Sequence, residues 1–188
     1  MTVKDSYPTQ KFDSCLDALV GSKWYCSMDL KSGYHQIEMD EKDKEKTAFH
    51  TEEGLFQWTM MSMGLVNSAA TFNRVLERIL VGIPTELCVL YIDDVLVHAP
   101  SCQDMFLRLR LVLDRFKGAG VKLNTSKCCL FRKQVKFLGH VISAEGVHPD
   151  PGKTEAVRLW PRPCCVKDVR AFLGLCGYYR RLYLNLQI

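Results

Sequence analysis

The segment VLYIDDVLVHAP, residues 89–100, constrains the fold more than any other part of the chain. Two apolar runs flank the adjacent aspartates Asp93 and Asp94, and this pattern predicts a β-hairpin. Two carboxylates held side by side and partly out of water are unfavourable unless a cation or a proton compensates their charge. The alternative is an exposed hairpin turn, where aspartate is common. The segment therefore predicts a sheet that carries a carboxylate pair at one edge.

Hydrophobic periodicity predicts both helices and strands over the rest of the chain. Helices are expected over residues 11–21, 67–82, 103–120, 152–160 and 166–182. Strands are expected over residues 23–30, 32–40, 46–51, 54–61, 89–100, 121–124, 128–143 and 146–149. The charged run 41–47 is expected to be a solvated turn, and residues 161–163 (PRP) form the best candidate for a domain boundary. This order predicts an α+β domain in which helices pack on one face of an antiparallel sheet.

Composition narrows the class of protein. The chain has 188 residues, of which 47% are hydrophobic, enough for one domain or for one domain and part of another. Its apolar runs are too short for a membrane span, and no secretory signal pattern is present at the N-terminus. We therefore expect a cytoplasmic or nuclear protein that is not secreted and has no membrane partner. The nine cysteines include no CxxC pair, so reduced thiols are expected and a zinc site is not.

Charge is distributed unevenly along the chain. Residues 1–100 carry 9 basic and 15 acidic side chains, whereas residues 101–188 carry 16 basic and 6 acidic ones. The asymmetry has two interpretations: a drift in the composition of solvated surfaces, or a basic half that binds a polyanion such as nucleic acid.

Asp29 also ends a predicted strand, after the apolar segment KWYCSM. Neighbouring antiparallel strands would bring Asp29 together with Asp93 and Asp94 at one end of the sheet. Three clustered carboxylates either share a proton or bind divalent cations. Hard oxygen ligands favour Mg²⁺ or Mn²⁺, which keep coordination positions open for phosphates.

Five segments of the sequence favour bound divalent cations over a shared proton. They occur in the order SMDLKSGYHQIEMDEKDKEKTAF, MSMGLVNSAATFNRVL, LYIDDVLVHAP, LNTSKC and VKFLGHVISAEGV. Together they resemble the reverse transcriptase of gypsy-type LTR retrotransposons, and the resemblance runs from VKDSYP to RAFLGLCGYYRR. It implies a right-hand polymerase palm with partial fingers, and RNA-directed DNA polymerase activity with two Mg²⁺ ions. It also implies three parts: partial fingers and the start of the palm in residues 1–60, the palm in residues 61–150, and the start of the thumb or connection in residues 151–188.

The resemblance assigns the metal site residue by residue. Asp29, Asp93 and Asp94 match the metal-binding catalytic aspartates, the last two within the motif YIDD. Leu30 matches the residue whose backbone carbonyl joins the metal. Two metals would activate the primer 3′-hydroxyl and neutralise the phosphates.

The resemblance also assigns contacts to the incoming nucleotide. Ser32 and Gly33 match positions whose amides meet the triphosphate, and Tyr34 matches the ring that excludes a 2′-hydroxyl. Met63 and Gly64 match the positions that pack against the nucleotide. The alternative for Tyr34 is a core tyrosine.

Primer and template contacts complete the assignment. Lys127 resembles a lysine near the leaving pyrophosphate, although a solvated lysine is an equal alternative. Tyr91 and the segment Phe137, Leu138, Gly139 and His140 resemble the primer-binding elements, with His140 expected to pack rather than to react. The implied partners are an RNA or DNA template, a DNA primer, deoxynucleoside triphosphates and the rest of a Pol polyprotein, including RNase H and integrase.

The chain departs from the family pattern in two respects. Ser62 and Ala69 replace prolines of the second motif, which is expected to loosen that loop and the start of its helix. The chain also begins after the basic strand of the fingers. Two rival functions therefore remain: a truncated, catalytically inert remnant that still binds nucleic acid, and a protein-interaction scaffold.

Overall fold

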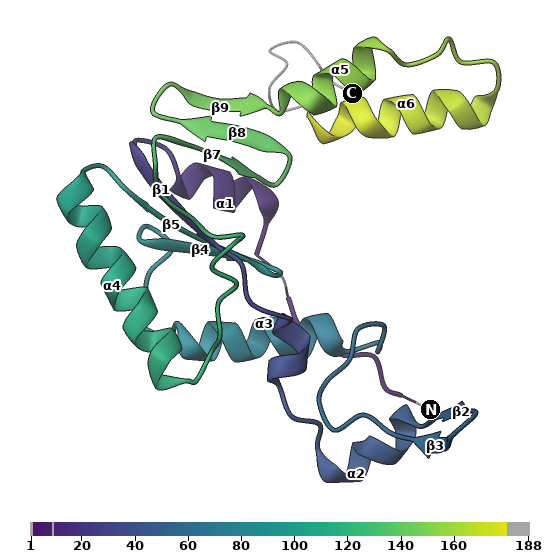
Figure 1. Cartoon of the computed structure of the whole chain (residues 1–188). Helices are drawn as coiled ribbons and strands as arrows, with labels where there is room; N and C mark the ends of the chain where they lie inside the picture. Colours follow the sequence, from purple (N-terminus) through teal and green to yellow (C-terminus); the bar gives the residue numbers. More distant parts are fainter. Residues whose placement is uncertain (1, 9, 180–188) are drawn as a thin grey trace.

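A four-stranded antiparallel sheet forms the centre of the computed structural model, which describes residues 2–8 and 10–179 (Figure 1). The strands lie in the order β4–β5–β1–β6. Their bounds are β4 Cys88–Tyr91, β5 Asp94–Ala99, β1 Trp24–Met28 and β6 Cys129–Arg132. The predicted hairpin of residues 89–100 is therefore present, and β1 lies directly beside its second strand.

Helices α3 (Ser68–Ile79) and α4 (Cys102–Gly118) cover one face of this sheet (Figure 1). Because side chains alternate along a strand, Cys26 and Met28 of β1 point to this face. They belong to a buried cluster with Phe72 of α3 and with Met105 and Phe116 of α4. The predicted α+β fold, an antiparallel sheet with helices packed on one face, is confirmed, and α3 and α4 are the helices on that face.

The opposite face of the sheet is also buried. Tyr25 of β1 and Leu96 of β5 form a second cluster with Leu16 of helix α1 (Phe12–Ala18) and with Phe137 and Ile142 of a separate three-stranded sheet. That sheet consists of β7 Gln134–Phe137, β8 His140–Ser143 and β9 Gly146–Pro149. Burial on both faces explains why the central strands read as continuous apolar runs rather than alternating ones.

The segment between β1 and α3 differs most from the predicted elements. It contains the 3₁₀ turn η1 (Gly33–Gln36), helix α2 (Glu41–Lys44), the 3₁₀ turn η2 (Glu45–Thr47), and strands β2 (Phe49–Thr51) and β3 (Gly54–Phe56). The strand predicted over 32–40 is wrong because Ser32 takes a left-handed conformation, with φ of 49°, and its carbonyl accepts a hydrogen bond from the His35 amide. The charged run 41–47 is helical rather than a turn, and the Asp40 side chain caps it by accepting a hydrogen bond from the Lys42 amide.

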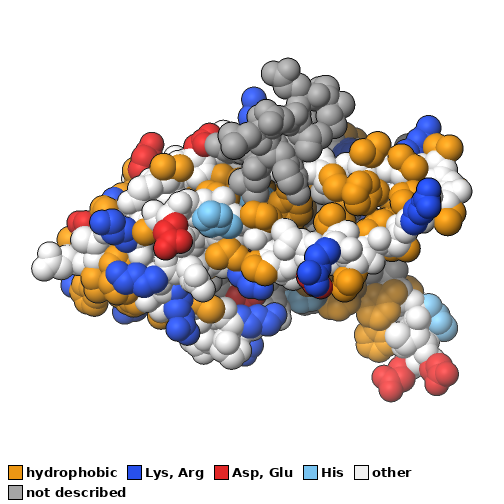
Figure 2. All heavy atoms as spheres, turned by 90° about the horizontal axis from the view of Figure 1, so that it is seen from above, with side chains coloured by type: hydrophobic (Ala, Val, Ile, Leu, Met, Phe, Trp, Pro, Cys, Tyr) orange, Lys and Arg blue, Asp and Glu red, His pale blue; other side chains and the backbone are white. Residues whose placement is uncertain are grey.

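Two helices follow the third strand of the smaller sheet, α5 (Pro151–Arg158) and α6 (Val166–Tyr178). The segment 159–165, which contains both prolines, separates them as predicted, and the end of the helix predicted over 166–182 lies outside the described residues. Among the described residues, no helix is both long and apolar enough to cross a membrane. On the face seen from above the smaller sheet, Lys and Arg side chains are more widespread than Asp and Glu (Figure 2).

Candidate active site

The β4–β5 hairpin turns within two residues and presents carboxylates at its tip. Tyr91 pairs with Asp94, so Ile92 and Asp93 form the turn, with Ile92 at a positive φ of 53°. Strand β1 pairs with β5 such that its last residue, Met28, lies opposite Val95. The same antiparallel register carried one residue further sets Asp29 beside Asp94. All three predicted aspartates thus lie at one edge of the central sheet.

The three carboxylates influence one another electrostatically. Burial raises the pKa of Asp93; a hydrogen bond from the Tyr34 hydroxyl opposes this rise, and the charge of Asp29 adds to it. Burial also raises the pKa of Asp94, with further contributions from the charges of Asp93 and Asp29. The edge of the sheet therefore concentrates negative charge in a partly desolvated place, where a cation would relieve the repulsion.

Lys127 is one cation that already lies at this edge. Its ammonium Nζ is 3.9 Å from Oδ2 of Asp29, and both side chains are substantially exposed, so the pair is a weak one. The backbone supports the arrangement: the Asn124 amide donates to the Asp29 carbonyl at 2.8 Å, and the Lys127 amide donates to the Asn124 carbonyl at 3.0 Å. The sequence led us to expect Lys127 near the leaving pyrophosphate or free in solvent, and the structure sets its ammonium beside Asp29.

A divalent cation fits the donor chemistry of this edge but would need additional ligands. Within residues 2–8 and 10–179, no three His, Cys, Asp or Glu side chains are gathered closely enough to hold a metal ion as they stand. The Leu30 carbonyl is one further oxygen, since the bridge between Leu30 and Leu123 uses the neighbouring Asp29 carbonyl and Lys31 amide instead. Carboxylate and carbonyl oxygens are the ligands that Mg²⁺ and Mn²⁺ prefer, and Mg²⁺ sites are commonly completed by water and phosphate.

The predicted nucleotide residues Ser32, Gly33 and Tyr34 follow the first aspartate within a single tight turn. The Tyr34 ring contacts the edge of the Phe72 ring, with centroids 5.0 Å apart. Gly33 is required beneath it, because a Cβ atom there would lie 2.7 Å from Cζ of Phe72. Burial raises the pKa of Tyr34, and the nearby Asp93 raises it further. Tyr34 thus packs against the core with its ring and reaches the carboxylates with its hydroxyl.

The loop before α3 holds the other two predicted nucleotide residues. The Met63 side chain is 67% exposed, and Gly64 has a positive φ of 86° that favours glycine. The hydroxyl of Ser68 donates to the carbonyl of Ser62 at 2.7 Å, and both serines are buried. This hydrogen bond ties together the loop in which the family has proline at position 62.

Of the predicted primer-binding residues, Tyr91 ends β4, and Phe137, Leu138, Gly139 and His140 lie on the β7–β8 hairpin. Leu138 and Gly139 form its turn, with φ values of 48° and 70°. Their carbonyls are held from α6: the Tyr178 hydroxyl donates to Leu138 at 2.7 Å, and the Tyr179 hydroxyl donates to Gly139 at 3.1 Å. His140 is buried, and its Nδ1 is hydrogen-bonded to the Leu138 carbonyl at 2.7 Å. His140 packs, as predicted, and the turn is fixed from outside the hairpin.

Phe12 links this hairpin to the aspartate hairpin. Its ring lies 6.5 Å from that of Tyr91, 5.3 Å from that of His140 and 5.3 Å from that of Tyr178. Sequence reasoning missed Phe12 and the tyrosine pair as parts of the site. The only signal was their place on the apolar faces of two predicted helices, which does not distinguish them from ordinary core residues.

The sequence is similar to those of known reverse transcriptases and retroelement polyproteins. Residues 1–142 match the family described as reverse transcriptase (RNA-dependent DNA polymerase). The chain is 37% identical to the retrovirus-related Pol polyprotein from transposon 297 of Drosophila melanogaster over 98% of its length. It is 35% identical to the Pol polyprotein from transposon gypsy of the same fly over 95% of its length.

Solved reverse transcriptase structures share the fold of this chain. A foamy viral protease-reverse transcriptase in complex with double-stranded DNA superposes with a TM-score of 0.87 at 25% identity, over 95% of this chain and 31% of that one. The corresponding complex with an RNA/DNA hybrid gives a TM-score of 0.82, again at 25% identity, over 95% of this chain and 24% of that one. The predicted polymerase palm with partial fingers is confirmed.

The chain spans only part of these proteins. It covers 18% of the length of the transposon 297 polyprotein and 17% of the gypsy polyprotein. Within that span, the ordered motifs, the palm fold and the family match agree. The chain belongs to the reverse transcriptase (RNA-dependent DNA polymerase) family.

Proposed function

We propose that this chain is the polymerase module of a retroelement Pol polyprotein and extends a DNA primer on an RNA or DNA template. The observation that carries the proposal is the convergence of Asp29, Asp93 and Asp94 at one edge of the central sheet, where burial and, to a smaller extent, the neighbouring carboxylates raise the pKa of Asp93 and Asp94. A structural turn has no need of three carboxylates gathered at one place. A nucleotidyltransferase needs them to bind cations.

Asp29, Asp93 and Asp94, with the Leu30 carbonyl, would hold two Mg²⁺ ions, or Mn²⁺ in their place. When bound, such ions favour ionisation of the primer 3′-hydroxyl and neutralise charge on the phosphates. The chain itself supplies rigid placement. The β4–β5 turn fixes Asp93 and Asp94, and backbone hydrogen bonds on both sides of Asp29 fix the third carboxylate.

The turn after Asp29 would bind the deoxynucleoside triphosphate. We assign the amides of Ser32 and Gly33 to the phosphates and the ring of Tyr34 to the sugar, where it would exclude a 2′-hydroxyl. Lys127, whose ammonium forms an ion pair with Asp29, would bind the leaving pyrophosphate. The exposed Met63 and the adjacent Gly64 would pack against the nucleotide.

The β7–β8 hairpin would hold the primer end through Phe137, Leu138, Gly139 and His140, together with Tyr91. In this assignment, residues 1–60 are partial fingers and the start of the palm, residues 61–150 the palm, and residues 151–188 the start of the thumb or connection. The basic half of the chain would bind template and primer phosphates. The remaining Pol segments, RNase H and integrase among them, would act as partners.

Primer extension with an aspartate variant tests this function. Asp93→Asn keeps the size of the side chain and removes one charge, so extension with Mg²⁺ should fall by about 100-fold or more. Binding of an RNA–DNA hybrid should persist, because phosphate contacts lie elsewhere. The matched control is Asp114→Asn on the exposed surface of α4, which should extend primers as the unmodified chain does.

Two results would contradict the proposal. Equal extension by the unmodified chain and Asp93→Asn would make Asp93 a turn residue. Hybrid binding without extension by either protein, even when a fingers segment is supplied, would favour the inert remnant.

A further inference from the structure

The side chain of Gln36 joins two segments that are far apart in sequence and flank the aspartate edge. Its Oε1 accepts a hydrogen bond from the Lys122 amide at 2.7 Å. Its Nε2 donates to the Lys122 carbonyl at 2.9 Å and to the Lys31 carbonyl at 2.6 Å. A single amide group thus fastens the turn after Asp29 to the segment that leads to Lys127.

The backbones of these two segments pair over a short stretch. Between them the backbone forms one isolated bridge, Leu30 with Leu123, through the Lys31 amide to the Lys122 carbonyl and the Asn124 amide to the Asp29 carbonyl. No continuous strand pairing extends past this bridge toward Gln36. Beyond the bridge of Leu30 with Leu123, the three hydrogen bonds of Gln36 therefore continue the contact between the segment around Lys122 and the turn of residues 31–36.

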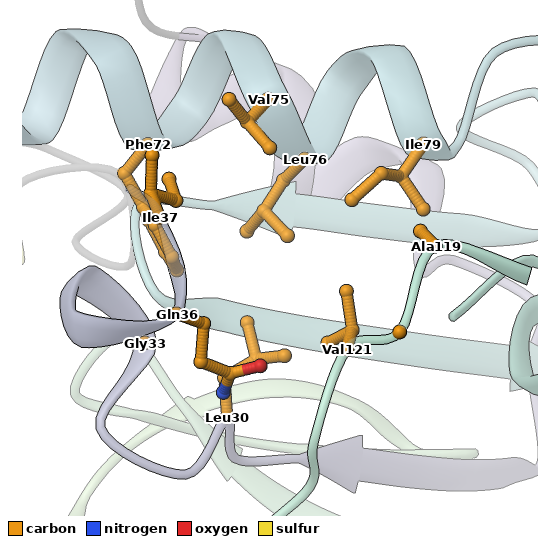
Figure 3. Close-up of a pocket in the computed structure, with 11 residues that line it drawn as sticks. Leu30, Gly33, Gln36, Ile37, Phe72, Val75, Leu76, Ile79, Ala119 and Val121 are labelled. Atoms are coloured by element: carbon orange, nitrogen blue, oxygen red, sulfur yellow. The ribbon is translucent and has the colours of Figure 1, made fainter. Parts of the chain in front are cut away.

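The turn of residues 31–36 contains an unfavourable backbone conformation, and a pocket borders one side of it. Ser32 takes a left-handed conformation that is unfavourable for a residue other than glycine. Behind the turn lies an apolar pocket of about 80 Å³, bordered by Leu30, Gly33, Phe72 and Val121 (Figure 3). The side of the turn that borders this pocket has fewer packing contacts than a fully buried segment would have.

Tyr34 depends on the position of this turn. Among the described residues, the aromatic ring that it contacts is that of Phe72, and Asp93 lies near enough to raise the pKa of its hydroxyl after burial, the larger cause. A displacement of about 1 Å at a positioning element can cost about 100-fold in rate. The residue that fixes the turn therefore controls how closely the Tyr34 ring approaches a sugar bound beside Asp93.

We propose that Gln36 is a positioning residue for sugar discrimination, holding the turn of residues 31–36 so that Tyr34 excludes ribonucleotides. This inference rests on the proposed polymerase function. It predicts that loss of the Gln36 hydrogen bonds relaxes the preference for deoxynucleotides more than it affects binding of template and primer.

Gln36→Met tests the inference, because methionine has a similar length and cannot make the three hydrogen bonds. Single-nucleotide incorporation is measured with a deoxynucleotide and with the matching ribonucleotide, together with the dissociation constant for template–primer. The ratio of kcat/KM for the deoxynucleotide to that for the ribonucleotide should fall about tenfold, mainly through a lower KM for the ribonucleotide, and the dissociation constant should stay unchanged. Gln103→Met, at an exposed position of α4, is the matched control.

Hydrogen exchange on the same proteins gives a readout that needs no activity. The amides of Lys31 and Lys122 should exchange faster in Gln36→Met, while α3 amides keep their protection and show that the variant is folded. Unchanged exchange, or faster exchange with an unchanged selectivity ratio, would overturn the inference and leave the polymerase proposal intact. If the unmodified chain and Gln103→Met incorporate neither nucleotide, the proposed function fails and the inference falls with it.

Discussion

At the scale of single residues, Asp94 places a charge where folding disfavours it. Burial raises its pKa, and the neighbouring charges of Asp93 and Asp29 raise it further. A carboxyl whose pKa is raised in the folded state binds a proton more tightly there than in the unfolded chain. Stability therefore falls as the pH rises above the ordinary aspartate value of 3.8, and at neutral pH the ionised group is destabilising.

Asp94→Asn should for this reason stabilise the protein at pH 7 in the absence of divalent ions. Because solvent screens a half-exposed carboxylate, we expect a gain of no more than about 1 kcal/mol. The measurement is the melting temperature with and without Mg²⁺. Mg²⁺ should raise the melting temperature of the unmodified chain and have a smaller effect on the variant. A lower melting temperature for Asp94→Asn in metal-free buffer would contradict this account.

The sequence predicts a functional role for some residues of the site and not for others. Asp93 and Asp94 stand out because two like charges interrupt apolar runs, and the family motifs add Asp29 and Tyr34. Gln36 does not stand out, because its partner Lys122 lies 86 residues away and no local pattern encodes that contact. Physical reasoning from sequence finds residues with an unusual local context and misses those whose role depends on tertiary contacts.

At the scale of elements, the sequence predicts the strands of the central sheet well and the connections between sheets poorly. Residues 128–143 read as strand almost throughout, whereas the structure divides them between β6, on the central sheet, and β7 and β8, on the smaller one. Phe131 has a positive φ of 52°, and the pairing of β1 with β6 shifts register between Tyr25 and Ser27. Hydrophobic periodicity predicts that this segment is extended. It does not predict where the segment breaks or which of the two sheets each part joins.

Strand β5 also carries a buried histidine outside the candidate site. The hydroxyl of Ser22 lies 2.8 Å from Nδ1 of His98, and Nε2 of His98 lies 3.0 Å from the Thr85 carbonyl. Burial lowers the pKa of His98 below its ordinary value of 6.5; the hydrogen bond to Thr85 and the charge of Glu86 oppose this, and Arg108 adds to it. The neutral ring is thus the form that folding favours.

His98 should make stability depend on pH in one direction. A histidine with a lowered pKa binds fewer protons when folded than when unfolded, so its contribution is complete above about pH 6.5 and declines as the pH falls below that value. His98→Gln removes the titrating group, although it lowers stability overall. Melting temperatures between pH 7.5 and 5 should therefore decline less steeply for the variant than for the unmodified chain. Parallel declines for the two proteins would exclude His98 as a source of the pH dependence.

At the scale of the whole molecule, opposite charge on the two halves of the chain favours binding of a polyanion by the C-terminal half. Affinity for an RNA–DNA hybrid should fall linearly with salt concentration on logarithmic axes, because neutralised phosphates release counterions. Lys122→Gln should reduce the slope by about 1 if its ammonium contacts a phosphate. Lys46→Gln is the control, because Lys46 lies in the acidic half and is paired with Asp43. An affinity that does not depend on salt would instead support a protein-interaction scaffold.

We propose that Asp29, Asp93 and Asp94 together bind two divalent cations beside the primer end. The most direct measurement is the anomalous scattering of Mn²⁺ in crystals of the chain with template–primer and a deoxynucleotide. We predict two Mn²⁺ peaks whose nearest protein ligands are carboxylate oxygens of these three aspartates, at about 2.1–2.3 Å. Mn²⁺ bound elsewhere, or a bound nucleotide with no Mn²⁺ at Asp29 and Asp93, would contradict the claim.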